Sequence, residues 1–131
     1  MADEHNVEVM RRLAELWGRG EYEAIPELLH EDVVSYTTPE WPVQGPYHGR
    51  EAFLDAIQHW LAPWERLDLQ LIDIESFGER LAVHGRWISR GQASGIENVL
   101  DFGVLVDFDE GLIRRLEFFR EPAAARQEAG A

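Results

Sequence analysis

The sequence contains no cysteine, no lysine and no long apolar run. Without cysteine there can be neither a disulfide bond nor a thiolate nucleophile, and a cytoplasmic location is expected. No segment approaches the roughly 18–20 apolar residues that a membrane span needs. The first ten residues also lack the basic, apolar and small-residue order of a secretory signal. These absences predict a soluble protein.

Positive charge is scarce as well. The chain has 25 acidic residues and 12 basic ones, all of them arginine, so its formal net charge at pH 7 is −13. Phosphate binding requires a basic face, which argues against nucleic acid as a partner. The same acidity disfavours anionic membrane surfaces.

The length of 131 residues predicts a single domain, 1–131, large enough to bury a core. We expect that core to extend over about 6–121, with 122–131 as a tail that is frayed or weakly helical. The five histidines show no metal-binding spacing, and no glycine-rich phosphate loop follows a strand. The sequence therefore predicts neither a metal site nor a cofactor.

The first half of the chain has helical periodicity. Apolar residues recur at helical spacing from Asn6 to Gly18, from Glu21 to His30 and from Arg50 to Leu61. A short strand, Asp32 to Tyr36, is expected after the second helix, followed by a loop rich in proline and aromatic residues from Thr37 to Gly49.

The second half alternates with a period of two, from Asp68 onward, from Leu81 to Arg90 and again from Ser94 to Glu121. Asp109-Glu110-Gly111 is expected to turn the last segment into a hairpin. Both faces of its first strand are largely apolar, so both must be covered. We expect one face to enclose a pocket and the other to meet a second subunit. Helices followed by antiparallel strands predict an α+β fold.

The order of these segments resembles a known superfamily. A helix precedes GRGEYEAIPELLHEDV, an aromatic loop, a helix beginning with YHGREAF, and strands containing RG, SG and FDEGLIRRLEFF. This order is similar to that of the nuclear transport factor 2-like superfamily, and most similar to its SnoaL-like branch. The resemblance covers about Val7 to Glu121. It implies a cone in which three N-terminal helices pack in a curved, mainly antiparallel sheet, with an apolar pocket and a dimer contact through the outer sheet face.

The SnoaL-like branch includes polyketide cyclases and ketosteroid isomerases, whose catalytic residues can be sought here. The isomerases use a tyrosine, a base carboxylate and a protonated aspartate, and the matching positions hold Leu13, Thr37 and Val104. The acid/base aspartate of the cyclases also falls near Val104. None of the three residues supplies the required acid or base, so the known forms of both activities are not expected.

Limonene-epoxide hydrolases, another branch, hold a water molecule with an Asp-Arg-Asp relay. Asp101 and Arg86 are available for such a relay. Strand parity, however, predicts that the two side chains point to opposite faces, with Asp101 outward.

Strand parity also predicts which residues line the pocket. His84 and Arg86 are expected to share its wall and are the candidate catalytic residues, as a general base and an anion-binding group. The alternative is a histidine satisfied by a neighbouring carboxylate beside an arginine in an ion pair. Trp87 is expected on the outer face, at a dimer interface. The candidate ligand-binding residues are aromatic, with two polar exceptions: Trp17, Tyr36, Trp41, Phe53, Trp60, Trp64, Asn98, Phe102, Phe118 and Arg120.

Two functions from different classes follow. The first is a homodimeric pocket protein that binds a small hydrophobic or aromatic molecule, with or without acid/base chemistry of the isomerase, cyclase or hydrolase type. The second is a non-catalytic dimerisation or structural module whose cavity is vestigial. A cavity too small for a ligand would favour the second.

Overall fold

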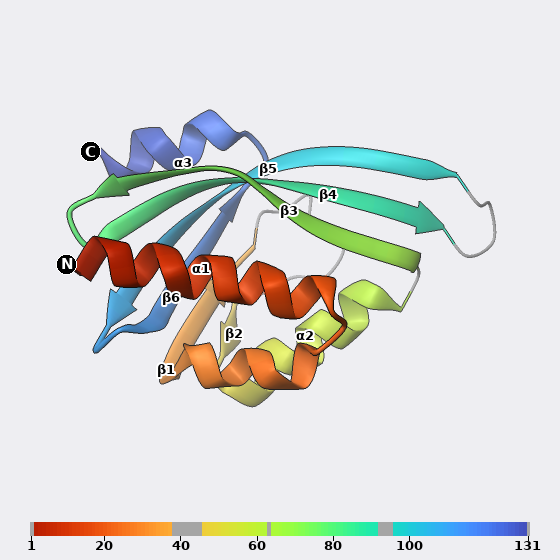
Figure 1. Cartoon of the computed structure of the whole chain (residues 1–131), viewed down its shortest axis with the longest axis horizontal. Helices are drawn as coiled ribbons and strands as arrows, with labels where there is room; N and C mark the ends of the chain where they lie inside the picture. Colours follow the sequence, from red (N-terminus) through yellow and green to blue (C-terminus); the bar gives the residue numbers. More distant parts are fainter. Residues whose placement is uncertain (1, 38–45, 63, 92–95, 131) are drawn as a thin grey trace.

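The chain folds as an open six-stranded sheet with helices on both sides (Figure 1). The computed structural model describes residues 2–37, 46–62, 64–91 and 96–130, with the side chains of all of these except 2, 3, 60, 65 and 66. The helices are α1 (Ala2–Gly18), the 3₁₀ helix η1 (Tyr22–Leu28), α2 (Arg50–Leu61) and α3 (Pro122–Ala129).

The sheet has the order β2-β1-β6-β5-β4-β3, and its neighbours are antiparallel except β1 and β6. The predicted α+β class and mainly antiparallel sheet are therefore confirmed. The strands are β1 (Leu29–Tyr36), β2 (Tyr47–His48), β3 (Trp64–Phe77), β4 (Arg80–Gly91), β5 (Glu97–Asp109) and β6 (Leu112–Phe119).

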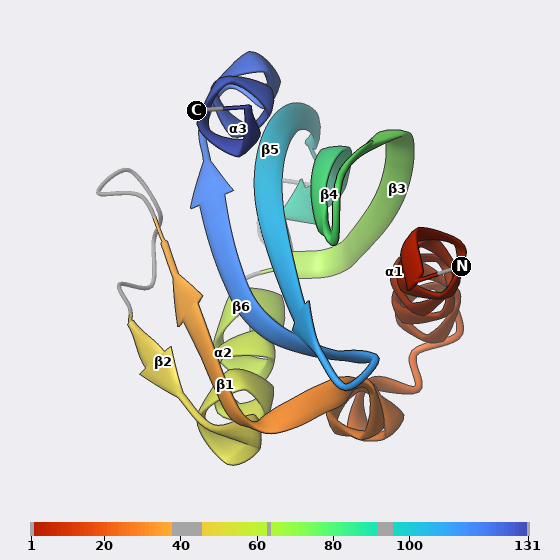
Figure 2. The ribbon, with the colours of Figure 1, turned by 90° about the vertical axis from the view of Figure 1, so that its left-hand side faces the viewer.

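The sheet is strongly curved, and its concave side faces α1 and α2 (Figure 2). We call this concave side the inner face and the opposite side the outer face. Apolar side chains of α1, η1 and α2 form one buried cluster with those of β1 and β3 to β6. The core thus lies between the three N-terminal helices and the inner face, as expected.

The predicted boundaries of α2 are confirmed, whereas those of the first two helices shift. The first helix already begins at Ala2. The second ends at Leu28, because Leu29 and His30 already belong to β1. His30 therefore does not end a helix. Its Nδ1 instead accepts a hydrogen bond from the backbone N–H of Asp32, at 3.0 Å.

The end of the chain, expected to be a frayed or weakly helical tail, forms the helix α3. α3 lies on the outer face, where Ala125 is fully buried and packs with Ala82 and Leu105. The approach is close, because a Cβ atom placed on Gly103 would lie 3.0 Å from that of Ala125. The buried residues of this helix are the alanines Ala125 and Ala129, which form no stripe of large apolar side chains that would have predicted its packing.

The predicted turn between β5 and β6 is confirmed. Glu110 and Gly111 have φ angles of 55° and 78°. Two consecutive positive φ values are typical of a type I′ turn, whose twist matches that of the flanking strands. In the part of the chain that the structure describes, no helix is both long and apolar enough to cross a membrane.

Candidate functional site

Alternate residues of the central strands form the inner face. On β4 these are odd-numbered, because Val83 and Trp87 join the main core. Leu81, Val83 and Trp87 pair with Val106, Val104 and Leu100 of β5. The inner residues of β5 are therefore even-numbered, since paired residues share a face.

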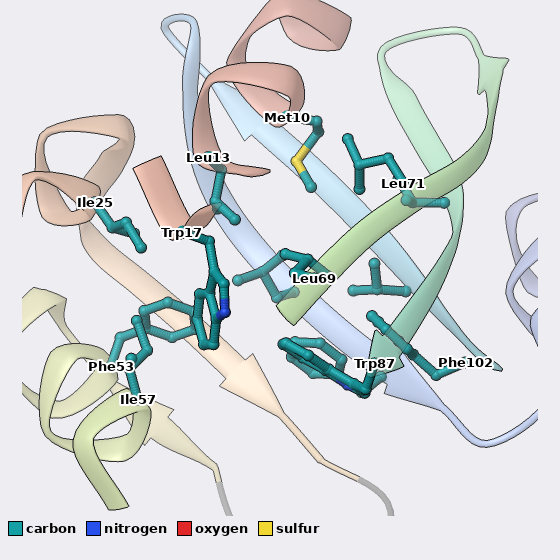
Figure 3. A pocket seen from close by; sticks show the side chains of 14 residues that line it. Met10, Leu13, Trp17, Ile25, Phe53, Ile57, Leu69, Leu71, Trp87 and Phe102 are labelled. Carbon is teal, nitrogen blue, oxygen red and sulfur yellow. The ribbon is translucent and has the colours of Figure 1, made fainter. Parts of the chain in front are cut away.

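A cavity lies between this face and the helices (Figure 3). Its volume is about 40 Å³. An apolar cavity of about 150 Å³ accepts benzene, so this one holds no aromatic ring without rearrangement. Every lining residue that the structure describes is apolar: Met10, Leu13, Trp17, Ile25, Phe53, Ile57, Leu69, Leu71, Val83, Trp87, Phe102, Val104, Leu116 and Phe118.

Aromatic rings form a continuous chain along the cavity wall. The rings of Trp87 and Phe102 stack, with centroids 5.2 Å apart and planes inclined by 13°. The ring centroids of Trp17 and Trp87 are 5.1 Å apart, and those of Phe102 and Phe118 are 6.0 Å apart. The indole N–H of Trp17 donates a hydrogen bond to the carbonyl of Leu67 at 2.9 Å. Its ring is therefore held in place, with its hydrocarbon edge available to the cavity.

Gly85 explains how the ring of Phe102 fits against the sheet. A Cβ atom at Gly85 would lie 2.4 Å from Cζ of Phe102. Gly85 and Phe102 are paired across β4 and β5, so the ring lies over the glycine backbone. Any larger residue at position 85 would displace the ring.

Four of the predicted ligand-binding residues line the cavity: Trp17, Phe53, Phe102 and Phe118. The match reflects the helical spacing on α1 and α2 and the correct parity on β5 and β6.

Four other predicted residues do not line it. Trp64, partly buried, begins β3 opposite Gly91. Arg120 is exposed just after β6, and Asn98 is exposed towards the end of the inner face. Tyr36 is on the outer face, where the guanidinium carbon of Arg115 lies 4.8 Å from its ring centroid.

Two further predictions cannot be placed. Trp41 and the side chain of Trp60 lie outside the residues that the structure describes.

The predicted orientation of His84 and Arg86 is wrong, because both lie on the outer face. There they meet Asp101, whose own outward orientation is confirmed. His84 Nε2 is 3.0 Å from Oδ2 of Asp101. Arg86 donates from Nε to Oδ1 at 2.6 Å and from Nη2 to Oδ2 at 3.1 Å. The alternative of a histidine satisfied by a carboxylate beside an ion-paired arginine describes this arrangement.

These contacts keep Asp101 ionised. The hydrogen bond from Arg86, followed by that from His84, lowers the pKa of Asp101 from 3.8 to about 2. Arg86 and Asp101 share a face, so the prediction that they point apart is also wrong. Because that face is remote from the cavity lining, the pair still cannot hold a water molecule inside the cavity.

The inward and outward residues of β4 are the reverse of those predicted. This one reversal explains the corrections for His84, Arg86 and a third residue, Trp87. Trp87, expected outward, is only 8% exposed and lines the cavity. Alternation within one strand shows which residues share a face, but not which of the two faces points inward. The burial preference of the odd set, which contains Val83 and Trp87, was the signal that could have decided it. The same signal would have added Val83 to the predicted lining.

Among the residues that the structure describes, no group of three or more histidine, aspartate or glutamate side chains could hold a metal ion.

The comparisons with known proteins agree with this architecture. The SnoaL-like domain matches residues 10–116, most of the chain. The chain belongs to this SnoaL-like family. Comparison with curated proteins returned no match.

Several solved structures share the fold. A nuclear transport factor 2-like protein of unknown function from Burkholderia pseudomallei is 20% identical, with a TM-score of 0.80 over 97% of this chain and 98% of that one. TerC, co-crystallised with polyporic acid, is 18% identical, with a TM-score of 0.79 over 97% and 99%. A protein from Catenulispora acidiphila with a ketosteroid isomerase-like fold, in complex with trimethylamine, is 12% identical, with a TM-score of 0.77 over 94% and 92%. At these identities the likeness is one of fold.

Proposed function

We propose that this SnoaL-like protein binds a small, uncharged, hydrophobic or aromatic molecule in the cavity of its cone. The observation that carries the proposal is the uniformly apolar lining by fourteen residues. Burial of apolar surface supplies roughly 25 cal/mol per Å². A charged ligand would lose its hydration there without gaining a partner among the described lining residues. TerC, which has the same fold, was crystallised with a small molecule, polyporic acid.

Binding must enlarge the cavity. Its volume of about 40 Å³ is well below the roughly 150 Å³ that accepts benzene. A ligand ring therefore displaces at least one lining side chain. Such a rearrangement costs binding energy, so we expect weaker affinity than in a preformed pocket.

We propose binding without catalysis in the cavity, because its described lining offers no acid, base or nucleophile. A catalytic role for His84 and Arg86 would need a substrate on the outer face. Substitution of His84 by alanine should leave binding in the cavity unchanged.

The test is calorimetric titration with naphthalene of the wild type and two matched variants. Phe118→Trp enlarges a ring that lines the cavity and should weaken binding by about tenfold or more. Phe119→Trp makes the same change on the next residue, which packs against the outer cluster with Ala82 and Leu105. It should leave the affinity within about twofold. Equal losses in the two variants, or no binding to the wild type, would contradict the proposal.

The small cavity favours a second candidate, a homodimerisation module whose outer face is the functional surface. In the part of that face beyond α3, Val99 is 60% exposed and pairs with the half-buried Ile88. The rows on either side pair Arg86 with Asp101 and Arg90 with Glu97. An apolar centre with charges of both signs around it suits a self-complementary contact. A monomeric mass in solution would contradict this candidate.

The absence of cysteine favours a cytoplasmic site of action for either function.

A further inference from the structure

Along the inner face of β5, the side chains change from buried to exposed between Phe102 and Leu100, two successive inward residues. Val104 and Phe102 are 4% and 2% exposed, whereas Leu100 is 43% exposed. Asn98, the next inward residue, is exposed as well. Figure 1 shows the ends of β4 and β5 extending past α2 on this side. The cone is therefore open at the row that pairs Trp87 with Leu100.

A change from apolar to polar side chains occurs one row farther out. Ser89 is 8% exposed and pairs directly with Asn98. Directly opposed residues of antiparallel strands have Cβ atoms about 5 Å apart. Ser89 and Asn98 thus project from neighbouring positions of the inner face. Leu67 of β3, opposite Ser89, completes the row.

The order of rows defines a gradient along the inner face. Phe102, which pairs with Gly85, lines the cavity; Trp87 with Leu100 forms the rim, and Ser89 with Asn98 lies beyond it. A hydroxyl and a carboxamide each both donate and accept hydrogen bonds. Ser89 lies two residues, about 7 Å, beyond Trp87, which lines the cavity. A molecule whose ring extends from the cavity to Trp87 would therefore reach both polar groups with a substituent at one end.

We propose that Ser89 and Asn98 form a polar subsite that selects ligands with a hydroxyl or carbonyl group at one end of a flat apolar body. This inference rests on the proposed binding function and goes beyond it, because it names the ligand class and the residues that recognise it. Trp87 and Leu100 contact the ligand where its apolar body meets the polar end. The subsite determines specificity, and the cavity supplies most of the affinity.

The test compares naphthalene with 2-naphthol, which differ only in one hydroxyl group. For the wild type we expect 2-naphthol to bind roughly three- to tenfold more tightly, as one net hydrogen bond predicts. The double variant Ser89→Ala/Asn98→Leu should lose this preference while still binding naphthalene. Glu97→Gln, on the other face of the same strand, is the matched control and should keep it.

The outcomes distinguish a failure of the polar subsite from a failure of the proposed binding function. If the double variant keeps the wild-type preference, or the wild type has none, the polar subsite is wrong and the apolar cavity still stands. If neither compound binds the folded wild type, the proposed function fails and the subsite fails with it. Because Asn98 is exposed, the single variant Asn98→Leu should fold normally and lower the preference on its own.

Discussion

Among individual residues, Asp101 lies between two basic side chains on the outer face. It accepts two hydrogen bonds from Arg86 and faces Nε2 of His84. The side chains are partly exposed, with 35% for Asp101 and 36% for Arg86. Water and salt therefore screen the ion pair, and its geometry matters more for orientation than for stability.

The lowered pKa of Asp101 predicts a defined dependence of stability on pH. Because the folded pKa is about 2 and the ordinary value is 3.8, the folded state binds fewer protons than the unfolded state in this window. The stabilising contribution is present above pH 3.8 and is lost as the pH falls towards 2. Urea unfolding should therefore show a larger difference between wild type and Asp101→Asn at pH 6 than at pH 2. Arg86→Met should reduce the pH dependence, and an equal difference at both pH values would contradict the account.

Residues on regularly periodic segments could be predicted from the sequence. Trp17 and Phe53 follow from helical spacing, and Phe102 and Phe118 from alternation on their strands. His84, Arg86 and Trp87 were assigned to the wrong faces, because β4 carries apolar residues at both parities and alternation alone does not choose between them. The large apolar side chains of the odd set, Val83 and Trp87, favour the observed orientation. The orientation of β4 depends on its register with β5, which pairs Trp87 with Leu100.

Among the elements, α3 differs most from expectation. The sequence predicted a frayed or weakly helical tail, and the helix that forms there packs over Ala82 and Leu105. Two buried alanines, Ala125 and Ala129, are its contacts with this surface. A helix with such small anchors buries little apolar area, so it should be among the first elements to detach.

A charge at its centre should release α3. Ala125 is fully buried, so Ala125→Asp places a carboxylate against an apolar surface and should lower the free energy of unfolding by about 1–3 kcal/mol. Ala123→Asp, at an exposed position of the same helix, should change it by less than about 0.5 kcal/mol. Hydrogen exchange should show lost protection in α3 with α2 unaffected. Equal effects of the two substitutions would mean that α3 is not packed as described.

For the whole molecule, the predicted α+β cone is confirmed. It could be predicted because its signals are distributed along the chain: helical spacing occurs in the first half and alternation in the second, and this order defines the fold class. The cavity volume could not be predicted, since it depends on how rings such as Phe102 pack over Gly85.

A homodimer contact on the outer face can be tested by substituting an exposed apolar residue. If Val99 lies at the centre of a homodimer contact, Val99→Asp should convert a dimer of about twice the 15.1 kDa chain mass into a monomer. Ile72→Asp, at another exposed apolar residue, on β3, is the control and should leave the mass unchanged. Sedimentation equilibrium measures both. A dimer that survives Val99→Asp would exclude this contact.

We propose that the inner face of the cone binds an apolar molecule. Nuclear Overhauser effects between naphthalene and protein methyl groups test it most directly. We expect effects to the methyl groups of Val104 and Leu116, which line the cavity, and none to Val99 on the outer face. Effects confined to Val99, or none to any methyl group at saturating naphthalene, would contradict it.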